Sequence, residues 1–96
     1  MAEKRILIID DTPAVRHALA DYLTDCGYET VTAEDGADGL AQARACQFHT
    51  VLVDLLMPRI DGLEVVATLT AEQPELPVVV VSGTGGLSEA VEAIRQ

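Results

Sequence analysis

Aromatic residues, basic residues and long apolar runs are all scarce in this chain of 96 residues. Tryptophan is absent, and two tyrosines and one phenylalanine leave the packing of a core to aliphatic side chains. Six Lys and Arg stand against 16 Asp and Glu, and the formal net charge of −10 argues against direct binding to nucleic acid or to an anionic membrane. No stretch approaches the roughly 20 apolar residues of a membrane span, and the first apolar run is too short for a secretory signal.

Cysteine is also rare, and its two occurrences are far apart in the sequence. Cys26 and Cys46 lack the close spacing of metal-binding thiols. We predict that both are buried, reduced and structural, which is typical of a cytoplasmic protein. A redox role for the pair is the alternative interpretation.

Two short apolar runs end on carboxylates. Residues 6–9 lead into Asp10 and Asp11, and residues 51–53 lead into Asp54. Such runs are typical of strands buried on both faces of a parallel sheet. If the two strands are neighbours, about 4.8 Å apart, the carboxylates converge, and like charges that close repel one another unless a cation lies among them. Oxygen ligands of this kind suit Mg²⁺, so we predict a magnesium site at the carboxyl ends of these strands.

Strand and helix patterns alternate four times, which predicts one α/β domain with a doubly wound parallel sheet built from right-handed βαβ units. The polar alternation of residues 29–33 is typical of an edge strand, whereas the other strands have the apolar composition of inner strands. The expected strands cover residues 4–9, 29–33, 51–54 and 78–81, and the expected helices cover residues 13–26, 38–46, 62–71 and 88–96.

The first expected helix has recognisable ends. Thr12 is expected as its N-cap, with Pro13 at the first helical position, and Gly27 is expected to end it in a left-handed conformation. The side chains expected to form its apolar stripe are Val15, Leu19 and Leu23, with Ala18 and Tyr22 beside them.

The order and spacing of several motifs resemble the receiver domain of bacterial two-component response regulators. These motifs are Asp10-Asp11, Asp54, Met57-Pro58, Asp61-Gly62 and the strand at 78–81 with Ser82-Gly83 after it. The resemblance covers the whole chain and implies the flavodoxin-like strand order 2-1-3-4-5. It also implies that Asp54 accepts a phosphoryl group from a sensor histidine kinase. The Mg²⁺ ligands that it implies are Asp10, Asp11, Asp54 and the backbone carbonyl of Leu56.

The resemblance assigns roles to two further side chains after the last expected strand. Ser82 occupies the position from which a Ser or Thr donates a hydrogen bond to the phosphoryl group, and Gly83 leaves room for the phosphoryl donor. Thr84 occupies a position that tunes dephosphorylation in the family. His17 and His49 lie away from the carboxyl ends of the strands, and we expect surface or packing roles for both.

Some features of the family have no match in this chain. Receivers carry a lysine at the end of a fifth strand, whereas the one lysine here is Lys4, before the first strand. The fifth strand, its aromatic switch residue and the last helix also lack counterparts. We therefore interpret residues 1–96 as a receiver domain that is incomplete at its C-terminus, or as part of a chain that continues past Gln96. The expected partners are a sensor kinase and an output domain or effector protein, with homodimerisation as a further prediction.

Three other functions are alternatives to a phosphorylation-dependent switch. A receiver-like interaction module would work through surface contacts without phosphate, and its aspartates would then be helix caps or solvated loop acids. A phosphatase with an aspartate nucleophile carries Asp-x-Asp-x-Thr, whereas Asp54 is followed by Leu55-Leu56-Met57. A dinucleotide-binding fold needs a Gly-x-Gly-x-x-Gly turn after the first strand, which this sequence lacks. We expect a regulatory domain that catalyses at most its own phosphorylation and dephosphorylation.

Overall fold

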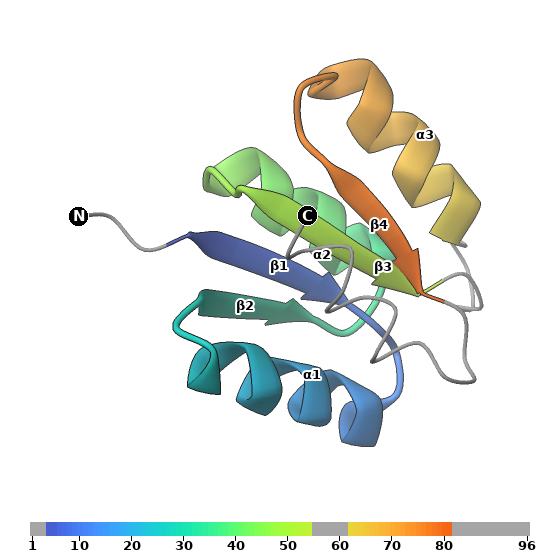
Figure 1. The fold of residues 1–96 in the computed structure, drawn as a ribbon. Helices are drawn as coiled ribbons and strands as arrows, with labels where there is room; N and C mark the ends of the chain where they lie inside the picture. The colour runs from blue at the N-terminus through green and yellow to red at the C-terminus, as the bar shows by residue number, and fades with distance from the viewer. Residues whose placement is uncertain (1–3, 55–61, 82–96) are drawn as a thin grey trace.

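The computed structural model describes residues 4–54 and 62–81, and these residues form four strands and three helices in alternation (Figure 1). In chain order the elements are β1 (Arg5–Ile9), α1 (Pro13–Asp25), β2 (Glu29–Ala33), α2 (Gly36–Ala45), β3 (Thr50–Asp54), α3 (Gly62–Glu72) and β4 (Val78–Val81). Seven of the eight expected elements are confirmed to within two residues at each end. The expected helix over residues 88–96 lies outside the described residues. None of the helices in the described ranges is long and apolar enough to cross a membrane.

The strands form one parallel sheet in the order β2-β1-β3-β4. This order confirms the predicted doubly wound α/β class and agrees with the first four positions of the flavodoxin-like order. β1 lies between β2 and β3. Its pairing with β2 runs from Arg5↔Glu29 to Ile9↔Ala33, and its pairing with β3 runs from Ile6↔Thr50 to Ile9↔Val53. β2 is an edge strand, as its polar alternation predicts. β4 forms the opposite edge within residues 4–54 and 62–81.

Helices cover both faces of the sheet, with α1 on one face and α2 and α3 on the other (Figure 1). Side chains of β1 alternate between these faces, because successive residues of a strand point in opposite directions. The cluster on the α1 face consists of Ile6, Ile8, Leu19, Leu23, Leu52 and Val81. The cluster on the α2 and α3 face consists of Leu7, Ile9, Ala33, Leu40, Ala43, Val51, Val53, Val65 and Leu69. Both faces of β1 and β3 are therefore buried, which explains their apolar sequences.

α1 begins and ends where the sequence predicts. The extended backbone of Thr12 precedes Pro13, and Gly27 has φ of +98°, a conformation that L side chains rarely adopt. The apolar stripe is narrower than expected. Leu19 and Leu23 are buried, whereas Val15 and Tyr22 are 40% and 41% exposed.

α2 begins two residues before its predicted start at Asp38 because an aspartate caps it. The backbone of Asp35 is extended, and its Oδ1 accepts a hydrogen bond of 2.7 Å from the backbone N–H of Asp38. This is the usual N-cap arrangement, in which a side-chain oxygen binds an N–H group that has no partner within the helix.

The prediction that the cysteines are buried is wrong. Cys26 and Cys46 are free thiols, and both are exposed. Each is the C-cap residue of a helix, Cys26 of α1 and Cys46 of α2. Their positions explain their exposure, because the chain leaves the helix at these residues and the buried helix positions lie in the preceding turns.

Candidate functional site

The carboxyl edge of the sheet brings the ends of β1 and β3 together. Ile9 pairs with Val53, so the residues that follow them, Asp10 and Asp54, lie at the same level of the sheet. Each lies two positions after a residue of the α1-face cluster, Ile8 in β1 and Leu52 in β3. Since side chains alternate along a strand, the pairing places both carboxylates on the same side of the sheet edge.

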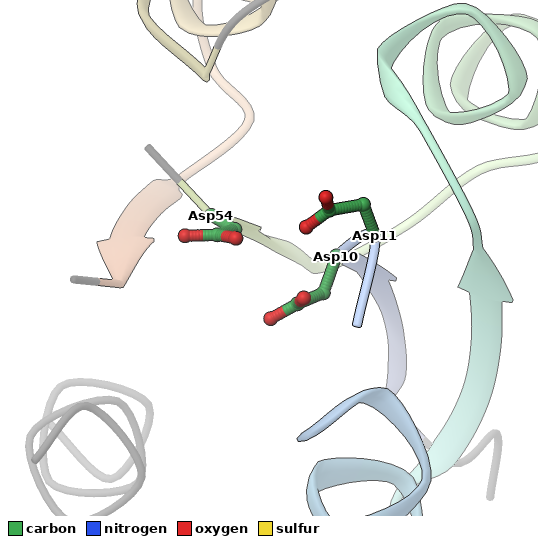
Figure 2. Close-up of side chains that lie close together, drawn as sticks. All are labelled: Asp10, Asp11 and Asp54. Atoms are coloured by element: carbon green, nitrogen blue, oxygen red, sulfur yellow. The ribbon is translucent and has the colours of Figure 1, made fainter. Parts of the chain in front are cut away.

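Three of the predicted site residues form a carboxylate cluster (Figure 2). One carboxylate oxygen from each of Asp10, Asp11 and Asp54 lies within 4.8 Å of the others. Asp10 is 4% exposed and Asp54 is 8% exposed, whereas Asp11 is more open to solvent. In Figure 2, Asp54 faces the two other aspartates across the sheet edge. The pairing of two neighbouring parallel strands thus produces the convergence expected from the sequence.

The surroundings of Asp10 disfavour its negative charge. Burial raises the pKa of the Asp10 carboxyl group above its ordinary value, and the nearby charge of Asp11 raises it further. The backbone N–H of Thr12 donates a hydrogen bond of 2.8 Å to Oδ1, which opposes this rise, as does the positive charge of Arg16. The net direction is upward. A positive ion among the carboxylates would therefore relieve an unfavourable charge.

Arg16 lies beside the carboxylate cluster, although none of the motifs described above includes it. Its Nη1 donates a hydrogen bond of 2.9 Å to the backbone carbonyl of Asp10. Side chains in a helix point back toward the N-terminus, so a long residue in the first turn of α1 reaches the preceding loop. A signal was present in the sequence, because a cation in the first turn opposes the helix dipole and calls for a nearby acid.

The cluster is chemically suited to a hard divalent cation. Carboxylate oxygens are the ligands that Mg²⁺ takes in proteins, commonly one or two with water completing the shell. Asp10, Asp11 and Asp54 supply three such groups, and two of these residues are buried. The buried carboxylates repel one another without a cation. The residues present therefore fit the magnesium ion that the sequence predicts.

The other candidate residues are either outside the described residues or away from the carboxylate cluster. Leu56, Ser82 and Thr84 lie outside the described residues, so their roles stay predictions. His17 is exposed on α1. His49 lies at the opposite edge of the sheet, where its Nδ1 accepts a hydrogen bond of 2.9 Å from the backbone N–H of Arg5. The backbone N–H of His49 also donates to the carbonyl of Arg5 at 2.8 Å, so this imidazole extends the β1–β3 pairing.

A shallow groove of about 570 Å³ lies at the amino ends of the strands, away from the aspartates. The loop before β3 and the loop before β4 line it with residues 47–49 and 73–77. In open α/β sheets, ligands bind outside the carboxyl ends of the strands. The acidic edge and not this groove is therefore the candidate site.

The fold and the carboxylate cluster together define a class of protein, a flavodoxin-like α/β domain with an acidic cation site at the carboxyl edge of its sheet. Residues 6–96 match the family described as the response regulator receiver domain, and the chain belongs to this family. Receiver domains are regulatory signalling modules.

Similar proteins include a regulatory protein and a response regulator of known structure. The chain is 39% identical over 93 residues to the nitrogen assimilation regulatory protein NtrX of Azorhizobium caulinodans, covering 95% of this chain and 20% of NtrX. The structure of TrrA from Thermotoga maritima with Mg²⁺ and BeF matches with a TM-score of 0.82 and 30% identity, covering 95% of this chain and 79% of that one. A complex of TrrA with the histidine kinase ThkA matches with a TM-score of 0.80 and 34% identity, covering 83% and 69%. This chain thus spans about a fifth of the length of NtrX.

Proposed function

We propose that this chain is a phosphorylation-dependent switch in which Asp54 accepts a phosphoryl group from a sensor histidine kinase. The convergence of Asp10, Asp11 and Asp54 within 4.8 Å at the carboxyl edge of the sheet carries this proposal. A surface interaction module has no need of three carboxylates held so close, because their mutual repulsion only destabilises it. The complex of the related TrrA with a histidine kinase supports the choice of donor.

The proposed reaction moves one phosphoryl group between two side chains. A carboxylate oxygen of Asp54 forms a bond to phosphorus while the phosphorus–nitrogen bond of the kinase phosphohistidine breaks. The electron pair of that bond stays on the imidazole, and Asp54 becomes an acyl phosphate. Bound Mg²⁺ supplies neutralisation of charge on the phosphoryl oxygens. Asp54 is 8% exposed, so the reacting residue presents only a small part of its surface to solvent.

The other predicted residues have separate roles in this proposal. Asp10 and Asp11 hold the cation, together with the backbone carbonyl of Leu56. Ser82 donates a hydrogen bond to the phosphoryl group, and Thr84 tunes the rate of dephosphorylation. The switch acts in the cytoplasm on an output domain or an effector protein, and the greater length of relatives such as NtrX supports an output outside these 96 residues.

Phosphoryl transfer from a small donor tests the assignment of Asp54. The full-length natural protein is incubated with acetyl phosphate, with and without Mg²⁺, and its intact mass is measured. We expect one added phosphoryl group in the wild type with Mg²⁺ and none in Asp54→Asn. Asp21→Asn, at an exposed position of α1, is the matched control and should label like the wild type. Equal labelling of the wild type and Asp54→Asn would refute the assignment.

A further inference from the structure

Asp10 is held in place through its backbone as well as its side chain. Its N–H donates to the carbonyl of Ala33 at 3.2 Å, and its own carbonyl accepts from Nη1 of Arg16 at 2.9 Å. Its Oδ1 accepts from the backbone N–H of Thr12 at 2.8 Å. Together these bonds fix the orientation of the Asp10 carboxylate relative to the backbone around it.

Arg16 closes a ring of hydrogen bonds around this aspartate. The backbone N–H of Arg16 donates to the carbonyl of Thr12 at 2.9 Å, which forms the first turn of α1. Thr12 in turn donates to the Asp10 side chain, and the Arg16 side chain returns to the Asp10 carbonyl. The ring fixes the acidic loop to the rigid helix that follows it.

The positive charge of Arg16 cannot strengthen cation binding directly. A guanidinium beside the cluster repels a divalent ion, and a cation in the first turn of a helix opposes the helix dipole. Both effects favour a neutral residue at this position, although the same positive charge helps to keep Asp10 ionised. The hydrogen bond to the backbone of Asp10 is the contribution that a neutral aliphatic residue cannot make.

We propose that Arg16 is a positioning residue, which sets the cation affinity of the carboxylate cluster by fixing Asp10 and touches neither the metal nor the phosphoryl group. This inference rests on the proposed function. Groups that orient a metal ligand typically contribute 10- to 100-fold to metal affinity. Two opposite effects of removing the side chain can be told apart by sign. Loss of its charge strengthens cation binding, whereas loss of its positioning weakens it.

The test is a calorimetric titration of the full-length natural protein with Mg²⁺ alone, at low and high salt. We expect Arg16→Ala to raise the Kd for Mg²⁺ by about tenfold or more, at both salt concentrations. Arg16→Lys keeps the charge and a flexible donor, and should lie between the wild type and Arg16→Ala. His17→Ala changes an exposed neighbour on the same helix and should bind Mg²⁺ like the wild type.

A second measurement separates positioning from general damage. At saturating Mg²⁺, labelling of Arg16→Ala by acetyl phosphate should return to the wild-type rate, because the hydrogen bonds described for Arg16 go to backbone carbonyls of Asp10 and Thr12. If the wild type binds Mg²⁺ normally and the Kd is unchanged or lower in Arg16→Ala and Arg16→Lys, the positioning role is overturned and the proposed function still stands. A rate that stays low at saturating Mg²⁺ overturns it too. Absence of Mg²⁺ binding by the wild type overturns the proposed function, and this inference with it.

Discussion

Gly39 in α2 packs directly against the side chain of Ile9 in β1. A Cβ atom at Gly39 would lie 2.7 Å from Cγ1 of Ile9 and closer still to Cδ1. Ile9 is buried in the core and immediately precedes Asp10. A glycine inside a helix usually costs about 0.5–1 kcal/mol relative to alanine, so this close contact is the physical reason for glycine here.

Gly39→Ala should therefore destabilise the protein, although alanine is the better helix former. Overpacking of a core typically costs about 1–3 kcal/mol, and we expect a loss in that range in urea unfolding. Ile9→Val removes the Cδ1 atom nearest to the new methyl group and alone should cost about 0.5–1.5 kcal/mol. The double variant should be more stable than the sum of the two single effects predicts. If the two losses of stability simply add, the destabilisation by Gly39→Ala does not come from its contact with Ile9.

Two leucines of α3 provide a test of which face of that helix is buried. Leu69 is fully buried, whereas Leu63 is 65% exposed. Leu69→Ala should lower the free energy of unfolding by about 2–5 kcal/mol, because it leaves a cavity against the sheet. Leu63→Ala, the matched control, should change it by less than about 0.5 kcal/mol. Similar losses at both positions in denaturant unfolding would contradict the observed packing of α3.

Magnesium should stabilise the folded protein through the carboxylate cluster. A ligand that binds only the folded state adds about 2.7 kcal/mol at a hundredfold excess over its Kd, so the melting temperature should rise with Mg²⁺ concentration. Asp11→Ala should remove most of this rise, because it removes one of the three converging carboxylates. Asp25→Ala, an exposed change at the end of α1, should keep it. If Asp11→Ala keeps the full magnesium-dependent rise, the ion binds elsewhere.

The raised pKa of Asp10 predicts how stability without metal depends on pH. Because the folded state binds this proton more tightly than the unfolded state, the contribution of Asp10 to stability is present at low pH. It is lost as the pH rises through the folded-state pKa. Asp10→Asn should thus stabilise the metal-free protein at neutral pH, since the amide keeps an acceptor for the Thr12 N–H and carries no charge.

The stabilisation by Asp10→Asn should shrink as the pH falls through the folded-state pKa of Asp10. Thermal unfolding in the presence of a chelator, repeated across pH values, measures this trend. Asp21→Asn on the exposed surface of α1 should show little effect at any pH. A loss of stability in Asp10→Asn at neutral pH would mean that the carboxylate is favoured in the folded state.

Much of the site follows from the sequence because parallel strands carry their end residues to one edge. The apolar runs before Asp10 and Asp54 predict two inner strands, and inner parallel strands that are neighbours must bring those aspartates together. The polar alternation of β2 likewise predicts its edge position. These inferences need only the period of a strand and the rule that crossover connections keep strands parallel.

Other features depend on the directions of single side chains and on where helices end, which the period of a strand does not give. The contact of Arg16 with Asp10 depends on the direction of one side chain from α1. The exposure of Cys26 and Cys46 depends on where two helices end, which local composition places only to within a residue or two. Val80 shows the same limit, because the all-valine composition of β4 predicts burial while Val80 is 41% exposed.

The pairing of β1 with β3 has a consequence for how the chain folds. Arg5 and His49, which are bonded to each other at one end of this pair, are 44 positions apart in the sequence. No hairpin can form any part of a wholly parallel sheet, and folds dominated by such distant pairings form more slowly than helical bundles. A chain emerging from the ribosome therefore cannot assemble the aspartate cluster until β3 has been synthesised and has docked beside β1. Binding of a divalent ion by all three aspartates therefore requires that β1 and β3 are already paired.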